Sequence, residues 1–591
     1  MNARLRKLRL VNSKKFKRGW QEIENATSRH AHRFITSRWR NLQEVRRHAV
    51  GWALLVLALS MATFWQSAQL AKLYTVEAPS KNTTYTEGVF GAVENLNPIF
   101  ASTPAERSAS RLLFANLLDY DEHSQLVGEL AKSWSVDETG KIYTLTLRSD
   151  ARWHDGVPVT SQDVLFTMSA IKNVDTKSPL YSSWRSIAVE KIDNLRVRFI
   201  LPAAYAPFLN SLVLGIIPEH VLGRLQPSEL RNNGYNHDPM VADGPFMLQD
   251  VHAVDVTRGH YVIRMSSNKD YFKGASQLST FNLHSYADRE QLLSAFRTQE
   301  VGAVSDLTTR QLNSLGPMDN IQHTESPLYN AVYAFLKTSS PMLQDVRVRK
   351  ALELATDQAQ LIKKLDGRVS PVTGPLLPGQ LGYKAETQQA GTDLTRAKQL
   401  LDEAGWKVGQ DGKRSRDGQP LQLQLMTVSA GDYPLIAEEL MNQWIKLGIS
   451  FNAQQVRADD IQQNVIAPRA YDVLIYEIAI GRDPDVFAYW HSSQATDHGF
   501  NLSDYKSAKI DELLDGARGH IDVALREAKY HSFIQQWLAD VPAIGLYRPS
   551  LSYVQTRHVT SFSPHPLVDQ TSRYYNVLDW SAGKELLHPT L

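Results

Sequence analysis

The stretch GELAKSWSVDETGKIYTLTLRSDARWHDGVPVTSQDVLFT, residues 128–167, contains the two patterns from which the fold class of this chain follows. Large apolar residues alternate with other residues over 142–147, and a period of two indicates a strand with one buried face. Thr160 and Asp163 then stand at the spacing of a capping box, which marks the first turn of a helix. Apolar residues at helical spacing over 164–171 complete that helix. This one segment therefore predicts a strand followed by a helix.

Strand and helix patterns interleave in the rest of the chain as well. Apolar residues recur every three or four positions over 348–362, and Asp345 stands where an N-cap is expected. Another stripe runs over 394–404, and Gly405 can adopt the left-handed conformation that ends a helix. Interleaved strands and helices argue for an α/β architecture.

One apolar segment near the N-terminus separates two parts of opposite charge. No Asp, Glu, Lys or Arg occurs between Arg47 and Lys72, and residues 49–71 are long enough to cross a hydrocarbon core of about 30 Å. The 14 Lys and Arg and 3 Glu before this segment sum to +11, whereas the 50 Lys and Arg and 59 Asp and Glu after it sum to −9. A basic flank before a single span predicts a cytoplasmic N-terminus and an exported body.

The alternative for this segment is a cleaved signal peptide. The basic region before it is longer than a usual signal-peptide n-region, and residues 60–71 offer only a poor small-x-small cleavage motif. We therefore expect an uncleaved anchor, and hence a single-pass protein of the cell membrane whose large domain is extracellular or periplasmic. The chain contains no Cys, which excludes a thioether-linked lipid anchor, disulfides and thiolate metal sites.

The basic tail, residues 1–48, mixes Arg and Lys with Phe16, Trp20, Phe34 and Trp39. Three interpretations remain open for it. The tail can fix the topology or contact anionic lipid headgroups, it can contact another membrane subunit, or it can bind nucleic acid. No recognisable DNA-binding motif fits in so short a segment, and we expect no nucleic-acid partner.

The 520 residues after the apolar segment exceed the size of one hydrophobic core, so two or more lobes are expected. Their composition is ordinary for a globular protein, and no internal repeat or low-complexity tract is visible. Residues 72–86 are polar and contain Pro79, which predicts a linker between the apolar segment and the body.

Several sequence blocks occur in an order that is typical of one protein family. Trp153-His154-Asp155-Gly156 lies at the centre of the 128–167 block. The other blocks, in chain order, are GAVENLNPIF (91–100), DPMVADGPFML (238–248), NKDYFKG (268–274), DVRVRKALELATD (345–357), DLTRAKQLLDEAGW (393–406), RDPDVFAYW (482–490) and the region of Pro542. From about Tyr85 to the C-terminus the body resembles the family 5 extracellular solute-binding proteins, the peptide- and nickel-binding subunits of ABC importers.

The resemblance implies an α/β fold of the periplasmic-binding-protein type (class II, cluster C), in which two lobes close over a ligand about a hinge. The chain is expected to cross between the lobes near Asn330 and near Ile544. The expected parts are a basic cytoplasmic tail (1–48), a single transmembrane helix (49–71), a linker (72–86), lobe I (87–330 plus 546–591, with an extra subdomain inserted at about 101–236) and lobe II (331–545).

Motifs of catalysis are absent from the sequence. There is no His-Glu-x-x-His, no Gly-x-Ser-x-Gly and no phosphate-binding Gly-Lys loop. Ser503 and Lys506 match the Ser-x-x-Lys pattern of penicillin-binding enzymes, but no companion motif accompanies them. We expect no catalytic residue, no cofactor and no metal site, and a protein that binds its ligand without transforming it.

Residues 471–490, YDVLIYEIAIGRDPDVFAYW, have the pattern of a buried strand followed by a turn. Members of the family that bind free peptides usually place an Asp shortly before this Asp-Pro, where it pairs with the α-ammonium of the ligand. That Asp is missing here, and the resemblance leaves Glu477 or Asp483 as the substitute, with Asp485 a weaker candidate. The alternative is that Asp483 and Asp485 only cap the following helix.

The segment MTVSAGDYP, residues 426–434, also departs from the family pattern. Dipeptide-binding members carry an Arg there for the carboxylate of the ligand, whereas this chain has Ser429-Ala430-Gly431. Longer peptides held through their backbone are therefore expected to fit better than dipeptides. Further ligand-binding candidates by position, each of which could equally serve packing, are Tyr433, Asn501, Glu94 and Asn95.

We therefore expect a membrane-tethered, extracellular substrate-binding subunit of an ABC importer. It captures peptides between its lobes and delivers them to the permease subunits. The alternative is a receptor that senses a ligand with the same body and signals through the transmembrane helix. A tail without a recognisable output domain disfavours the receptor.

Overall fold

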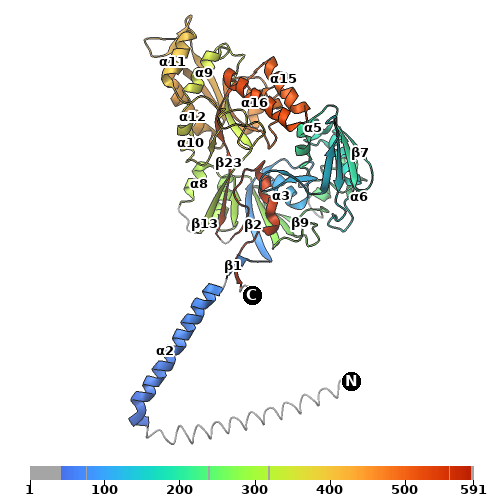
Figure 1. The fold of residues 1–591 in the computed structure, drawn as a ribbon, viewed down its shortest axis with the longest axis vertical. Coiled ribbons are helices and arrows are strands. Elements are labelled where there is room, and N and C mark those ends of the chain that lie inside the picture. The colour runs from blue at the N-terminus through green and yellow to red at the C-terminus, as the bar shows by residue number, and fades with distance from the viewer. Residues whose placement is uncertain (1–41, 75, 237–239, 317–319, 558, 588–591) are drawn as a thin grey trace. The chain divides into compact units, whose positions relative to one another are not determined.

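The computed structural model describes residues 42–74, 76–236, 240–316, 320–557 and 559–587 (Figure 1). Most of the predicted basic tail lies outside these residues. One long helix, α2 (Leu42–Tyr74), includes the predicted span 49–71 and extends beyond it at both ends. Its stretch Val50–Ser67 is long and apolar enough to cross a membrane, and none of these residues is buried.

The prediction of a linker over 72–86 is wrong in its extent. After α2, strands β1 (Val76–Pro79) and β2 (Thr83–Phe90) follow. β1 pairs with β24 (Lys584–Leu587), and β2 belongs to the large sheet of the body. The part of β2 that falls within the predicted linker, residues 83–86, contains three Thr and looks polar, yet Tyr85 is fully buried in the core of lobe I. Glu87, which follows, is fully buried as well and pairs with Arg573 at 2.7 Å.

Lobe I is built on a mixed seven-stranded sheet. Its middle strand β2 is parallel to β11 and β12, whereas β23, from the C-terminal part of the chain, is antiparallel to β12 and β13. In spatial order the strands are β13 (Ile321–Pro327), β23 (Ser550–Thr556), β12 (Ala303–Ser305), β2, β11 (Leu278–Tyr286), β10 (His260–Ser267) and β9 (Phe246–Asp255). Lobe I is therefore discontinuous in the sequence.

Aromatic side chains dominate the core of lobe I. The ring of Tyr85 lies 5.0 Å from that of Phe281 and 5.3 Å from that of Trp580, so the first and last parts of the body share one core. The helices of this lobe are α3 (Pro104–Leu113), α7 (Arg289–Arg297), α8 (Thr309–Ser314) and the 3₁₀ segment η10 (Gln570–Asp579).

A separate antiparallel sheet forms the inserted subdomain. Its strands, in spatial order, are β5 (Ala131–Val136), β6 (Ile142–Leu147), β8 (Arg196–Ile200) and β7 (Ala188–Lys191). The strand predicted over 142–147 is confirmed as β6, and its alternate residues are buried. The predicted capping box is confirmed too, because the backbone N–H of Thr160 donates to Asp163 Oδ2 at 2.9 Å at the start of α4 (Ser161–Lys172).

The insertion starts later than residue 101. α3 packs against β2, β9, β11 and η10, all of which belong to lobe I, so the inserted part begins after this helix. The block around Trp153 connects the insertion to the rest of lobe I. Its His154 Nε2 lies 3.1 Å from the carbonyl oxygen of Gly244. The remaining elements of the insertion are β3 (Leu118–Tyr120), β4 (Leu126–Gly128), α5 (Tyr181–Trp184), η4 (Ala206–Leu212) and α6 (Glu219–Leu222).

Lobe II contains a six-stranded sheet that is buried on both faces. Along β14, Val332, Ala334 and Leu336 enter one core, and Tyr333 and Phe335 enter the other. In spatial order the strands are β15 (Ser370–Pro371), β22 (Ala543–Arg548), β14 (Asn330–Leu336), β21 (Val473–Ala479), β19 (Gln422–Val428) and β20 (Ser450–Val456).

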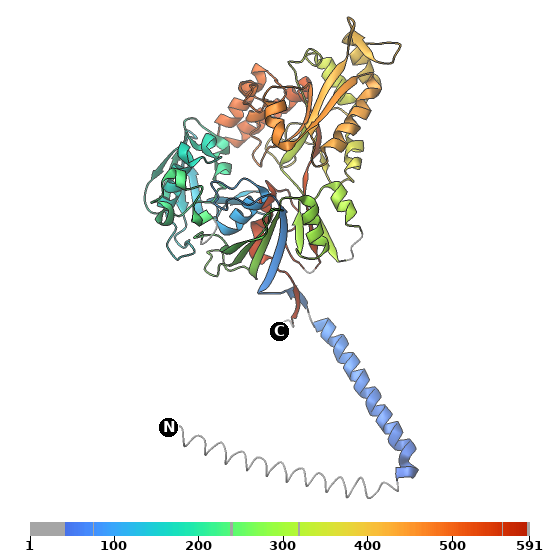
Figure 2. The same cartoon turned by 180° about the vertical axis from the view of Figure 1, so that it is seen from behind.

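Two groups of helices cover the two faces of this sheet (Figures 1 and 2). The first group comprises α9 (Val346–Leu354), α10 (Gln358–Lys364), α11 (Leu394–Glu403) and α12 (Tyr433–Trp444). The second comprises α13 (Ala458–Ile461), α14 (Phe487–Trp490), α15 (Ala508–Gly519) and α16 (Val523–Asp540). A small sheet of β16 (Lys407–Val408), β17 (Arg414–Arg416) and β18 (Gln419–Pro420) follows α11.

The apolar stripe over 348–362 is divided between two helices. α9 ends at Leu354, and Asp357 caps α10 by accepting a hydrogen bond from the backbone N–H of Gln360 at 3.0 Å. The predicted cap of α9, Asp345, is confirmed. The helix predicted over 394–404 is confirmed as α11, and Gly405 follows it with a φ of +87°.

The chain crosses between the lobes twice, after β13 and after β22. At the second crossing Arg548 donates a hydrogen bond to the carbonyl oxygen of Leu328 at 2.6 Å, and its guanidinium lies 4.8 Å from the Tyr329 ring centre. This crossing lies at Pro549, a few residues later than predicted, because β22 continues past Ile544 with every residue buried. The two crossings therefore pack against each other.

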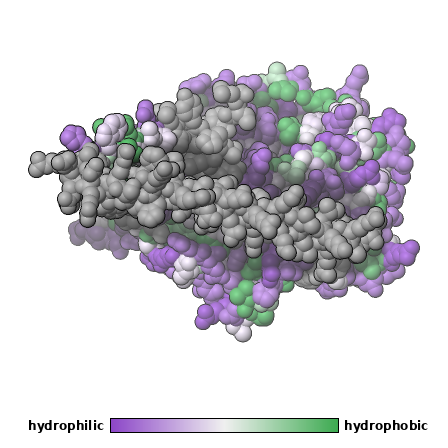
Figure 3. Space-filling model, turned by 90° about the horizontal axis from the view of Figure 1, so that it is seen from below, coloured by the Kyte–Doolittle hydropathy of each residue, from purple (hydrophilic) through white to green (hydrophobic). Residues whose placement is uncertain are grey.

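The solvent-facing surface is mainly polar on the side shown in Figure 3. Hydrophilic side chains predominate there, and hydrophobic ones occur in small groups. The visible part of this face is therefore suited to contact with water.

Candidate functional site

Glu477, near the end of β21, is held by two neutral side chains. Its Oε1 accepts a hydrogen bond from Asn330 Nδ2 at 2.6 Å, and its Oε2 accepts one from the Tyr433 hydroxyl at 3.1 Å. Asn330 opens β14 and stands diagonally across the antiparallel pair from Glu477, while Tyr433 opens α12. Two predicted binding residues, Tyr433 and Glu477, are thereby brought together beside the first crossing between the lobes.

The carboxyl of Glu477 has no cationic partner among the residues that the structure describes. Burial raises the pKa of this carboxyl above its ordinary value, the hydrogen bonds from Asn330 and Tyr433 lower it, and the carboxylate of Asp306 raises it again. Within the described ranges, Glu477 takes part in none of the ion pairs with Lys, Arg or His. A half-buried acid with neutral partners is suited to receiving a cationic group from a ligand.

Residues of lobe I reach lobe II on this side of the molecule. The hydroxyl of Thr309, at the start of α8, donates to Asp432 Oδ2 at 3.0 Å, and Asp432 directly precedes Tyr433. Nearby, Arg368 of lobe II donates to Asn313 Oδ1 at 2.8 Å. The lobes are thus in direct contact close to Glu477.

Asp483, the other predicted acid for a ligand ammonium, already has a cationic partner. Arg526 Nη2 lies 2.7 Å from its Oδ1 and 2.8 Å from its Oδ2. The two side chains are only 15% and 9% exposed, and Arg526 Nε also donates to the carbonyl oxygen of Ala517. The charge of Asp483 is therefore compensated inside lobe II, in contrast to that of Glu477.

Asp485 connects lobe II to the insertion. Its Oδ2 accepts a hydrogen bond from the Tyr205 hydroxyl at 3.0 Å and pairs with Arg518 Nη2 at 3.0 Å. The guanidinium of Arg518 also lies 4.9 Å from the Tyr205 ring centre. A second contact across the same junction joins Arg482 Nε to the carbonyl oxygen of Ser124 at 3.1 Å. The side chain of Asp485 thus stabilises the contact between lobe II and the insertion.

Glu94 and Asn95 stabilise a turn of lobe I. The backbone N–H groups of both donate to Glu106 Oε1, at 2.8 and 2.9 Å. The Asn95 side chain is buried and donates to the carbonyl oxygen of Arg231 at 2.8 Å, whereas the Glu94 side chain is exposed. The structure therefore does not group these two residues with Glu477 and Tyr433.

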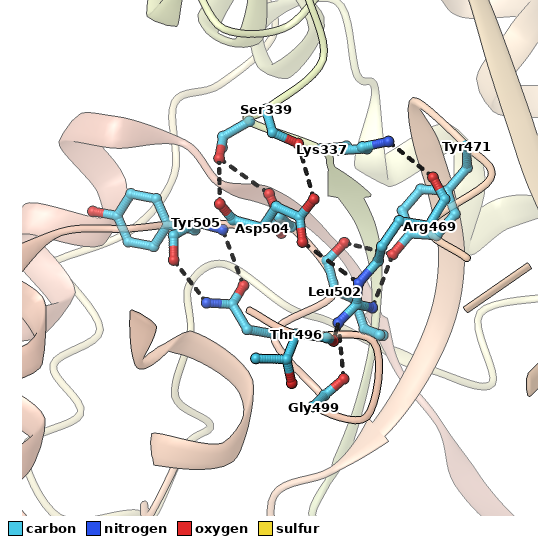
Figure 4. A network of polar contacts seen from close by, with 12 residues as sticks. Lys337, Ser339, Arg469, Tyr471, Thr496, Gly499, Leu502, Asp504 and Tyr505 are labelled. Atoms are coloured by element: carbon cyan, nitrogen blue, oxygen red, sulfur yellow. Dashed lines mark hydrogen bonds and ion pairs between the residues drawn. The ribbon is translucent and has the colours of Figure 1, made fainter. Parts of the chain in front are cut away.

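Asn501 is fully buried in lobe II, and its side-chain amide forms hydrogen bonds with the backbone of the same chain. Its Nδ2 donates to the carbonyl oxygen of Tyr505 at 2.8 Å, and its Oδ1 accepts from the backbone N–H of the same residue. Figure 4 shows the surrounding network, in which the hydroxyl of Ser339 donates to Asp504 and Arg469 donates to two backbone carbonyls. The amide of Asn501 is thus used to hold the loop before α15.

Four residues that complete these clusters were missed in the sequence: Asn330, Tyr205, Arg518 and Arg526. Arg526 follows Asp483 by 43 positions and Arg518 follows Asp485 by 33, so no helical or strand period connects the partners. Asn330 was expected at a crossing between the lobes but not as a partner of Glu477. Only the folded chain brings these groups together.

Comparison with known proteins places the chain in a family. The model of the bacterial extracellular solute-binding proteins, family 5 (middle part), matches residues 125–499, which is well over half of the chain. The chain belongs to this family. Its members are binding proteins, so the protein binds a solute and is not an enzyme. Its solute-binding domain is extracellular or periplasmic.

Named relatives extend this similarity to almost the whole body. The oligopeptide-binding protein AppA of Bacillus subtilis is 24% identical over 545 residues, which are 90% of this chain and 98% of AppA. The structure of AppA in complex with a nonapeptide has a TM-score of 0.68 and covers 85% of this chain and 99% of AppA, at 24% identity. The structure of NikZ from Campylobacter jejuni with Ni(L-His) has a TM-score of 0.70, covers 85% of this chain and 100% of NikZ, and is 23% identical. The expected two-lobed α/β fold is therefore confirmed.

Proposed function

We propose that this family 5 protein is the membrane-tethered, extracellular substrate-binding subunit of an ABC importer. It captures peptides between its two lobes and delivers them to the permease subunits. The family and the oligopeptide ligand named for the relative AppA support the class of ligand. α2, with its apolar stretch Val50–Ser67, supports the tether, and the +11 tail is suited to contact with anionic lipids.

One observation carries the peptide proposal: Glu477 is a half-buried acid with two neutral partners, beside a crossing between the lobes. The α-ammonium of a peptide matches the charge that this carboxylate lacks. Because lobe II has Ser429-Ala430-Gly431 where dipeptide binders carry an Arg, the far end of the ligand is held through its backbone. The site therefore favours peptides longer than two residues.

Identification of the bound ligand tests this function. Full-length protein is purified in detergent from cells grown in a peptide-rich medium and then denatured, and the released small molecules are identified by mass spectrometry. We expect peptides of three or more residues, and co-purified membrane proteins that include an ABC permease. Release of a different solute, with no peptide bound and no effect of added peptides on the melting temperature, would contradict the proposal.

A further inference from the structure

Two histidines and a glutamate converge in lobe I, on elements that do not contribute to the Glu477 cluster. His260 Nε2 lies 3.3 Å from His284 Nδ1. Glu300 Oε1 lies 3.7 Å from the first of these atoms and 3.8 Å from the second. The three ligand-type atoms thus form a nearly equilateral triangle.

The fold fixes each corner of this triangle. His260 and His284 lie on the neighbouring antiparallel strands β10 and β11, whose register places Val262 opposite His284 and sets the two imidazoles diagonally on one face. Glu300 follows α7, where Gln299 has a φ of +61° and the backbone N–H of Glu300 donates to the carbonyl oxygen of Ala295 at 2.9 Å. This helix end turns the chain back towards the two strands.

The surroundings hold the imidazoles in place and leave one side open. The ring of Tyr286 stacks on His260, with ring centres 4.4 Å apart and an interplanar angle of 21°. Both histidines are buried, whereas the side chain of Glu300 is 45% exposed and gives access from water.

The triangle has the size that a small metal ion requires. Zn²⁺ binds imidazole nitrogen and carboxylate oxygen at about 2.0–2.2 Å, so neighbouring ligand atoms of a tetrahedral site are about 3.3–3.5 Å apart. The edges of 3.3, 3.7 and 3.8 Å need a contraction of only a few tenths of an ångström.

We propose that His260, His284 and Glu300 bind one divalent transition-metal ion of the Zn²⁺ type, with water in the fourth position. Two imidazoles and a carboxylate are a ligand set that suits this class of ion, and the fourth position faces the exposed side. The ion would fasten the β10–β11 pair to the end of α7, within lobe I. This site is independent of the peptide site and goes beyond the proposed transport function.

Metal content and a spectroscopic probe test the site. Full-length protein without a polyhistidine tag is stripped with EDTA, dialysed against buffered Zn²⁺ and analysed for metal per chain. We expect one equivalent in the wild type, and a loss of that equivalent in His260→Gln, His284→Gln and Glu300→Gln, with at least about tenfold weaker binding. Co²⁺ should give the visible bands of a four-coordinate site in the wild type and in none of these three variants.

His252→Gln is the matched control, because His252 lies opposite Val262 on β9 and is exposed outside the triangle. It should keep the equivalent of Zn²⁺. Glu300→Gln alters an exposed side chain, so its melting temperature in EDTA should equal that of the wild type and show that the loss of metal is not a loss of folding. The proposal is overturned if the wild type binds no Zn²⁺, or if the three variants retain the same equivalent. In either case the His260–His284 contact is a plain hydrogen bond.

Discussion

The Tyr205 hydroxyl donates a hydrogen bond to Asp485 Oδ2 at 3.0 Å and so joins the insertion to lobe II. Arg518 pairs with the same carboxylate oxygen and covers the Tyr205 ring. A contact between the lobes exists only while they are close together. It therefore stabilises the closed arrangement relative to any open one, and the affinity for a ligand enclosed by closure depends on it.

Replacing Tyr205 by Phe should therefore weaken peptide binding. A hydrogen bond to a charged group contributes about 1.5–3 kcal/mol when buried, and the partly exposed Arg518 reduces this to about 1 kcal/mol, or roughly fivefold in affinity. Titration calorimetry with a bound peptide measures the change. Solution scattering of the free variant should show a larger radius of gyration than that of the wild type.

Tyr235→Phe provides the control for this experiment, because the Tyr235 hydroxyl donates to the carbonyl oxygen of Val241 within lobe I. It removes one tyrosine hydroxyl without touching the junction between the lobes. An equal loss of affinity in both variants would show that the Tyr205–Asp485 contact does not control closure.

Glu477→Gln should weaken the binding of peptides with a free N-terminus by about 2–5 kcal/mol, the range for breaking a desolvated charge pair. Gln keeps the size of the side chain. Its carbonyl oxygen can accept from Asn330, and its NH2 group can donate to the Tyr433 hydroxyl, so the fold is preserved. N-terminally acetylated peptides should bind the wild type more weakly than free peptides do, and should bind the variant and the wild type alike. Isothermal calorimetry with the free and acetylated forms of one peptide measures both effects.

Asp483→Asn separates the roles of the two acids. It leaves Arg526 buried without its counter-ion, so it should lower the free energy of unfolding by about 3–5 kcal/mol. Chemical denaturation measures this loss, and the discrimination between free and acetylated peptides should remain. If Asp483→Asn abolishes that discrimination and Glu477→Gln does not, the assignment of Glu477 to the ligand ammonium is wrong.

Local patterns predicted the elements whose causes lie within a few residues. The alternation that gives β6, the Thr160–Asp163 box that starts α4 and the glycine that follows α11 are of this kind. Partners far apart in the sequence remained hidden. Residues 83–86, at the start of β2, are placed in the predicted linker because nothing near them in the sequence indicates that Tyr85 packs against Trp580, in the last part of the chain.

In the candidate sites, too, contacts between residues far apart in the sequence could not be predicted. The sequence indicated Glu477 and Tyr433, but it did not show that Asp483 is neutralised by Arg526, because no periodicity connects them. It also predicted no metal site, since His260 and His284 are 24 positions apart and lack the spacing of a helical ligand pair. The strand register and the turn after α7 supply that proximity.

Glu353, on α9, should make the stability of the protein depend on pH. Burial raises its pKa from 4.5 to about 7, although a hydrogen bond from the backbone N–H of Ala390 and the charge of Lys350 oppose the rise. Below about pH 4.5 the group is protonated in the folded and unfolded states alike. Above about pH 7 it is ionised in both, and the folded state bears the cost of the buried charge. The contribution of Glu353 to stability therefore falls as the pH rises through this window.

Glu353→Gln removes this titration. The variant should be more stable than the wild type at pH 8, by at most about 3 kcal/mol, and equally stable near pH 4.5. Urea denaturation at the two pH values measures the difference. Glu386→Gln, at an exposed position of lobe II, should change stability at neither pH. A gain for Glu353→Gln that is the same at both pH values would point to packing and not to titration.

The last prediction concerns the membrane, and the lack of Cys in the chain makes a clean test available. Ser13→Cys places a thiol in the basic tail, and Ser228→Cys places one on an exposed turn of the insertion. Because a flank of +11 precedes the apolar stretch of α2, the tail should stay in the cytoplasm and the body should be outside. A maleimide that cannot cross the cell membrane should label Ser228→Cys in intact spheroplasts or protoplasts, and Ser13→Cys only after permeabilisation.

The mass of the extracted protein completes this test. An uncleaved anchor gives a chain that begins at or near Met1, so both variants fractionate with the membrane and the tail thiol is recovered with the body. Labelling of both thiols from outside would reverse the predicted orientation of the tail. A mature chain that begins after Ala62 or Ala71 would show that the apolar segment is a cleaved signal peptide, and the body would then reach the permease by diffusion and not from a tether.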